Sequence, residues 1–89
     1  MPRERLADAS EELRLAAEAA TGDERERIYR QADALADAAA ADEGPDHGKL
    51  ARHTHALREI EDAVDETAGD HVAAARELVS AYREGVDGV

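Results

Sequence analysis

Three of the four histidines lie close together, at the start of a helix that the spacing of apolar residues predicts over 47–68. They are His47, His53 and His55. Imidazole suits proton transfer and metal binding near neutral pH, so this cluster is the first candidate for chemistry. His53 and His55 are two positions apart, however, and residues two apart on a helix do not share a face. The cluster therefore does not predict a two-histidine grip on a metal ion.

His55, Glu59 and Asp62 do share one helix face, at steps of four and three residues. Nitrogen and oxygen ligands at that spacing favour a weak metal site if another helix supplies further ligands. A small regulatory protein with a metal or ligand site near His53, His55 and Glu59 is therefore the alternative function. The chain lacks the Glu-x-x-His pairs of di-iron bundles and the His-Glu-x-x-His of zinc proteases. We expect capping and solvated roles for these residues, and no cofactor.

No pattern in the chain predicts catalysis. Ser10 and Ser80 have no base nearby in sequence, and there is no phosphate loop or nucleotide fingerprint. The segment 47–50, His-Gly-Lys-Leu, resembles the motif of histidine-phosphotransfer bundles only loosely, because the residues after the histidine come in a different order. Arginines alternate with carboxylates, so direct nucleic-acid binding is not expected. We expect a protein that is not an enzyme.

The charge of the chain is its most unusual property. There are 22 acidic residues against 11 basic ones, and only one of the basic residues, Lys49, is a lysine. A net charge of -11 makes the compact state repel itself. At molar salt the Debye length falls to about 3 Å, so neighbouring carboxylates scarcely interact there while their hydration keeps the protein soluble. This composition is typical of a halophile's cytoplasm and predicts that monovalent salt is needed for stability.

The apolar residues recur at helical spacing throughout, and no stretch alternates for long enough to form a strand. The predicted fold is all-α, with four antiparallel helices forming two hairpins in a single four-helix bundle-like domain. The helices are predicted over 3–20, 24–41, 47–68 and 71–84. No apolar run is long enough to span a membrane, which fits a cytoplasmic protein.

Glycine, proline and aspartate mark the expected boundaries of the helices. Gly22 suits the left-handed conformation that closes a helix, and Asp23 then resembles an N-cap. Gly69 and Asp70 repeat this pair and are expected to separate the third and fourth helices. The domain therefore divides into a hairpin over 3–41, a Gly-Pro linker over 42–46, a hairpin over 47–84 and a frayed tail over 85–89.

The predicted core is thin, because the chain has no Phe or Trp and is rich in alanine. Burying a leucine is worth about 2 kcal/mol, while ordering each residue costs about 1.5 kcal/mol. A homodimer, or a complex with another protein, would bury the stripes that are left partly bare. The expected interaction surface is the heptad seam of the third helix with two aromatic anchors. Its residues are Leu50, His53, Leu57, Ile60 and Val64, with Tyr29 and Tyr82 as the anchors.

His53 takes a seam position at which leucine would be expected. A polar residue at such a position can fix the register or the oligomeric state of packed helices. If the ring is buried without an acidic partner, its pKa should fall.

Two segments carry a resemblance to a known family: Gly-Pro-Asp-His-Gly-Lys-Leu-Ala-Arg-His at 44–53 and Arg-Glu-Arg-Leu-Ala-Asp-Ala-Ser at 3–10. With them the chain resembles, over nearly its whole length, an uncharacterised family of small acidic α-helical proteins from haloarchaea. The resemblance implies a compact helical protein of halophilic origin and brings no site residues. The expected function is that of a non-enzymatic helical module for protein–protein interaction or scaffolding.

Overall fold

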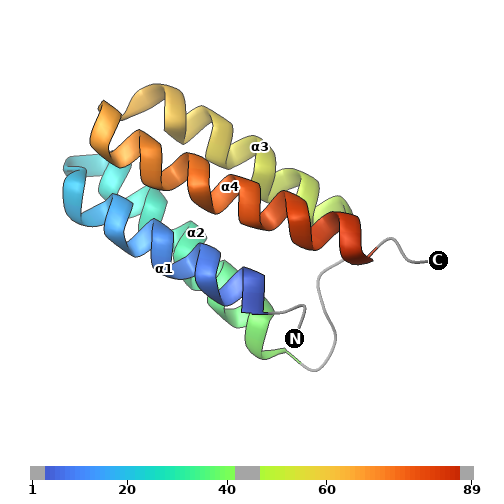
Figure 1. The fold of residues 1–89 in the computed structure, drawn as a ribbon. Coiled ribbons are helices and arrows are strands. Elements are labelled where there is room, and N and C mark those ends of the chain that lie inside the picture. Colours follow the sequence, from blue (N-terminus) through green and yellow to red (C-terminus); the bar gives the residue numbers. More distant parts are fainter. Residues whose placement is uncertain (1–3, 42–46, 87–89) are drawn as a thin grey trace.

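The computed structural model describes residues 4–41 and 47–86, which form four antiparallel α-helices (Figure 1). Within these two segments there is no strand. The predicted all-α fold with four helices is therefore confirmed. The helices are α1 Glu4–Ala19, α2 Gly22–Ala40, α3 His47–Ala63 and α4 Glu66–Val86.

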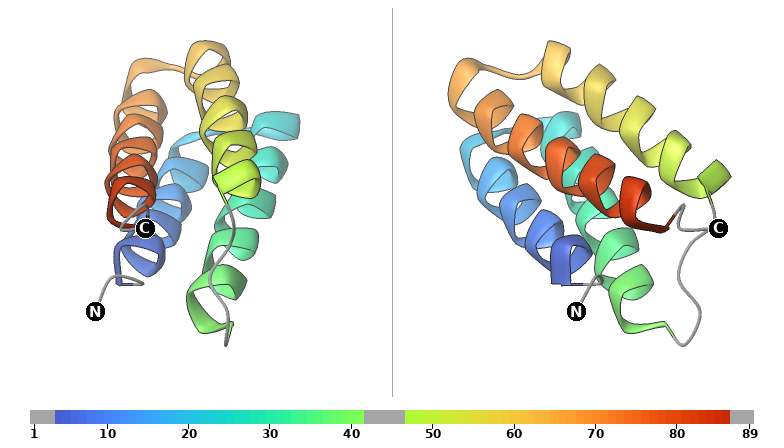
Figure 2. Two further views of the ribbon diagram at one scale, coloured as in Figure 1. Left: turned by 90° about the vertical axis from the view of Figure 1, so that its right-hand side faces the viewer. Right: turned by 45° about the vertical axis from the view of Figure 1, so that its right-hand side comes forward.

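The four helices do not contact one another equally. α1 packs against α2 and α4, and α4 packs against α1 and α3, so α1 and α4 form the central pair of the bundle. α2 and α3 contact each other least. Figure 2 shows the C-terminal turns of α2 diverging from the first turns of α3. The bundle is thus closed firmly on three sides and loosely on the fourth.

All four helices contribute to one core, which the chain fills by itself. Its largest side chains, at most 1% exposed, are Leu6, Leu13, Ile28, Leu35, Leu50, Leu57, Ile60, Val72 and Val79. Buried alanines on α1 fill the space between these larger side chains. One polar side chain joins them: the Ser10 hydroxyl donates to the Ala32 carbonyl of α2 over 2.7 Å. This buried hydrogen bond fixes the register of α1 against α2.

The turn between α1 and α2 was predicted correctly at Gly22 and wrongly at Asp23. Gly22 has a φ of +63°, the left-handed conformation in which a residue without a Cβ is favoured. α2 begins at Gly22 itself, with Thr21 at the N-cap position, so Asp23 is not the cap. The last carbonyls of α1 are satisfied from α2: Arg25 Nε donates to the Ala17 and Ala20 oxygens over 3.0 and 2.9 Å.

The turn between α3 and α4 lies earlier than the sequence predicted. α3 ends at Ala63, and α4 begins at Glu66 and continues through Gly69. The N-cap is Asp65, whose Oδ1 accepts a hydrogen bond of 3.0 Å from the Ala68 amide. Asp70 is therefore not a cap, and the two hairpins do not turn at equivalent Gly-Asp pairs.

The two glycines should respond in opposite ways to alanine substitution. A Cβ on Gly69 would lie 3.7 Å from the Glu61 carbonyl oxygen and 3.9 Å from a Val64 methyl carbon, which is ordinary contact. Gly69→Ala should therefore raise the free energy of unfolding by about 0.5–1 kcal/mol, because glycine is a poor residue inside a helix. Gly22→Ala should lower it by about 1 kcal/mol, because its φ is strained for any residue with a Cβ. Thermal unfolding at high salt measures both, and a loss of stability in Gly69→Ala would contradict the observed turn.

The predicted linker over 42–46 lies outside the described residues. The predicted tail over 85–89 is partly helical instead of frayed, because α4 continues to Val86; residues 87–89 are not described. None of the four helices, as far as they are described, has the length and apolar character needed to cross a membrane.

Candidate functional site

A polar or charged pair joins every two helices that pack together. Arg14 and Asp33 join α1 to α2, and Glu12 and His71 join α1 to α4, at 3.6 and 3.4 Å. The pair from α3 to α4 is Glu61 and Arg76, and the pair from α2 to α3 is Arg27 and Glu59, at 3.1 and 3.9 Å. Much of the polar chemistry of this small chain therefore serves to hold helices together.

His71 was expected at the surface, directly after a cap. Because α4 begins at Glu66, His71 instead lies in the second turn of α4, half-buried, with its Nδ1 3.4 Å from Glu12 Oε1. It therefore belongs to the central contact between α1 and α4.

His53 forms the polar contact between α2 and α3. The ring is half-buried, and its Nδ1–H donates to Oε1 of Gln31 over 2.7 Å. Burial lowers the pKa of His53 below the ordinary histidine value, so the ring is held neutral at pH 7. This is the direction expected for a seam histidine without an acidic partner. Together with Arg27 and Glu59, these two residues make up what we call the α2–α3 boundary.

The three residues of the alternative metal site do not come together. His55 is mostly exposed and has its Nε2 3.8 Å from Glu59, whereas His53 is turned toward Gln31 of α2. Glu59 also faces Arg27. Among the residues that the structure describes, no group of three histidine, aspartate or glutamate side chains is arranged to hold a metal ion. The side chain of His47, the third histidine of the cluster, is not described.

The predicted interaction seam is mostly not a surface, and this is a correction. Leu50, Leu57 and Ile60 are at most 1% exposed and Tyr82 is 5% exposed, all of them within the core of the single chain. A heptad stripe shows that a helix buries one face, but the partner here is the chain's own α4 and not a second subunit. Of the predicted seam, His53 and Val64 remain partly exposed.

Two large apolar side chains are exposed in the described part of the chain: Leu15 on α1 at 48% and Tyr29 on α2 at 39%. Leu15 follows Arg14, and Tyr29 lies one turn before Asp33, so the ion pair between Arg14 and Asp33 sets them at the same level of the hairpin. We call this surface, Leu15 and Tyr29 with that ion pair, the α1–α2 edge. The Tyr29 anchor was predicted; Leu15 was not, because it lies off the core stripe of its helix.

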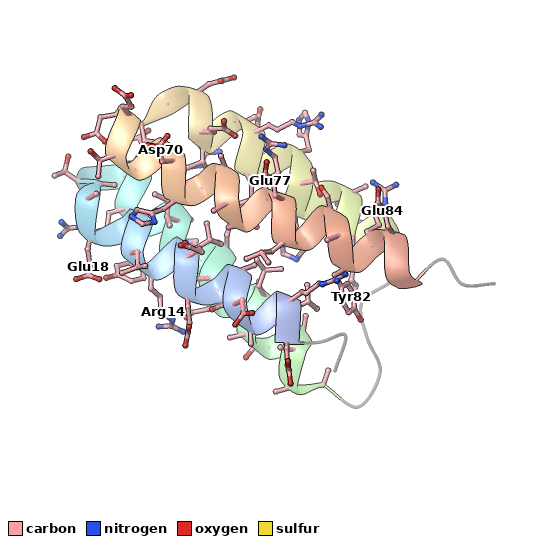
Figure 3. The ribbon with its side chains drawn as sticks, in the orientation of Figure 1. Arg14, Glu18, Asp70, Glu77, Tyr82 and Glu84 are labelled. Carbon is pink, nitrogen blue, oxygen red and sulfur yellow. The ribbon has the colours of Figure 1, made fainter. Side chains whose placement is uncertain are left out.

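Most of the charged residues on the two helices that carry the α1–α2 edge are acidic. α1 and α2 together carry ten acidic and five basic residues, so this hairpin has a net negative charge. Figure 3 shows Arg14 and Glu18 pointing outward from α1. Glu11 and Glu26 are also exposed. The edge therefore combines an apolar centre with an acidic rim.

One family model matches the chain, over residues 1–85, and it describes a family of unknown function. No curated protein and no solved structure matches.

Proposed function

The chain belongs to this family, DUF7553, and we propose that it is a non-enzymatic module for protein–protein interaction in a halophilic cytoplasm. The observation that carries the proposal is the α1–α2 edge, where Leu15 and Tyr29 remain exposed on a bundle that has already filled its own core. An aromatic side chain such as Tyr29 supplies interface area at low entropic cost.

The halophilic setting rests on the charge of the chain. A net charge of -11 with a single lysine is unfavourable for a small fold at low salt and is tolerated where the Debye length is only a few ångströms. Against such a hydrophilic surface, two exposed large apolar residues are more unusual than they would be on an ordinary protein.

The acidic rim favours a partner with a basic rim around an apolar pocket. A second copy docked symmetrically through this edge would bring Glu11 and Glu18 of both chains together, and like charges across an interface disfavour it. A homodimer was expected because the predicted core is thin for one chain. The single chain already buries its large core side chains, so the core does not require a second copy. We therefore propose a different protein as the partner.

A photo-crosslinking experiment tests the proposal. A photoreactive phenylalanine analogue at position 15 should crosslink to another protein in a high-salt lysate, whereas the same analogue at the exposed position 77 of α4 should not. The mass of the product distinguishes a second copy, which would add 9.6 kDa, from a different partner. No crosslink at position 15, or equal crosslinking at both positions, would contradict the proposed surface.

A further inference from the structure

The α2–α3 boundary is the weakest contact of the bundle. α2 and α3 contact each other least of the packed pairs, and their ends diverge where α2 finishes and α3 begins (Figure 2). Neither helix depends on this contact for its position, because α2 also packs on α1 and α3 also packs on α4. The two outer helices can therefore separate while the central pair of α1 and α4 stays intact.

Polar contacts contribute to this boundary. The Arg27–Glu59 pair is 3.9 Å long, with side chains 42% and 59% exposed, and such exposed pairs add little stability. The hydrogen bond from His53 to Gln31 is shorter, at 2.7 Å, and lies half-buried. It is thus the stronger of these two polar contacts, and it involves a group that titrates near neutral pH.

We propose that the bundle opens along the α2–α3 boundary, and that protonation of His53 favours the open form. The closed boundary desolvates the ring, whereas the open form returns it to water. The charged form of a desolvated ring is disfavoured, so a proton binds more tightly to the open form.

The charged groups around His53 do not reverse this preference. From α2 the neighbouring charged group is Arg27, one turn before Gln31 and paired with Glu59 of α3; from α3 it is Lys49, one turn before His53. On the side of α3 that faces α4, the charged pair is Glu61 with Arg76, two turns away. α1 does not pack against α3. The boundary's own carboxylate, Glu59, lies against Arg27 and His55, and among the described residues the hydrogen-bond partner of His53 is the neutral Gln31.

The direction of the pH dependence follows from the lowered pKa of His53. The open form binds the proton at about pH 6.5, the ordinary histidine value, and the closed form only at lower pH. Closure is therefore fully favoured above about pH 6.5 and is progressively lost as the pH falls toward the pKa of the closed form.

Hydrogen exchange by segment tests the inference. A helix that loses part of its tertiary packing opens its backbone hydrogen bonds more often. Protection of α2 and α3, corrected for intrinsic exchange rates, should therefore fall by about threefold or more between about pH 7.5 and 5.5 in 2 M KCl, while α1 and α4 keep theirs. This fall in protection is expected because each unit of pKa difference between the closed and open forms changes the equilibrium constant for opening by up to tenfold. His53→Gln should remove the pH dependence, and His55→Gln, which changes an exposed histidine of the same helix, should leave it intact.

Two results would overturn the inference. One is an equal loss of protection in all four helices, which would mean global unfolding instead of opening at one boundary. The other is the same pH dependence in His53→Gln. If that variant fails to fold, an NMR titration of the His53 ring in the wild-type chain decides, since an unshifted pKa of about 6.5 would show that the closed boundary does not discriminate against the proton.

Discussion

Replacing Leu57 with alanine should lower the free energy of unfolding of the single chain by about 3 kcal/mol. Leu57 is fully buried in the core, and truncating such a leucine removes its burial and leaves a cavity. Leu15→Ala is the matched control on the same residue type: its side chain is 48% exposed, so the change should stay within about 0.5 kcal/mol. Urea unfolding at high salt, with light scattering to report the mass, measures both variants.

The same pair of variants shows whether the apolar residues of α3 lie in an interface between chains or in the core of one chain. If Leu57 lay in an interface between chains, its replacement would dissociate an oligomer and leave the isolated chain nearly as stable as before. If it lies in the core of one chain, the stability of the monomer falls and does not depend on protein concentration. A concentration-dependent loss would contradict the closed core described above.

Lowering KCl from about 2 M to about 0.1 M should lower the melting temperature by about 10 °C or more. Salt acts in two opposite directions here. It weakens the ion pairs between helices, which are mostly exposed and contribute less than about 1 kcal/mol each. It also screens the mutual repulsion of a chain with a net charge of -11. The second effect should dominate, since a loss of about 2 kcal/mol moves the midpoint of a domain of this size by about 10 °C.

Neutralising exposed carboxylates is the control for the salt effect. Glu11→Gln, Glu18→Gln and Asp37→Asn together remove three negative charges from exposed positions of α1 and α2. The triple variant should need less salt than the wild-type chain to reach the same melting temperature. Circular dichroism melts over a range of KCl concentrations measure this, and a wild-type melting temperature that is independent of salt would refute the halophilic interpretation.

The sequence was sufficient to predict the number of helices and the extents of α1 and α2, because the apolar spacing and the helix-breaking residues agree there. It failed where two signals competed. Asp65 and Asp70 are both possible caps, and Gly69 before Asp70 resembled a helix end. Glycine costs only about 1 kcal/mol inside a helix, however, and the helix that continues through it is capped by Asp65 and buries Ala68 in the core. The position of the turn between α3 and α4 thus depends on tertiary packing, which capping and glycine patterns in the sequence do not describe.

The candidate site was harder to predict than the fold. The seam position of His53 pointed to a partly buried ring with a lowered pKa, but no pattern pointed to Gln31 as its partner on another helix. The buried role of Ser10 depends in the same way on a carbonyl of α2. The exposure of Leu15 is evident only once the face that α1 buries is known. Each missed feature is a relation between helices, and single-helix periodicity describes one helix at a time.

The central pairing of α1 with α4 determines how this chain can fold. The two helices lie at opposite ends of the sequence, and a hydrogen bond of 3.2 Å from Arg5 to the Ala81 carbonyl joins residues 76 positions apart. Contacts within each hairpin are local and form quickly, whereas closing so long a loop is slower. On the ribosome, the apolar face of α1 has no α4 to cover it until residues 66–86 have been synthesised. Completion of the core therefore waits for α4, and the nascent α1–α2 hairpin exposes Leu6 and Leu13 until then.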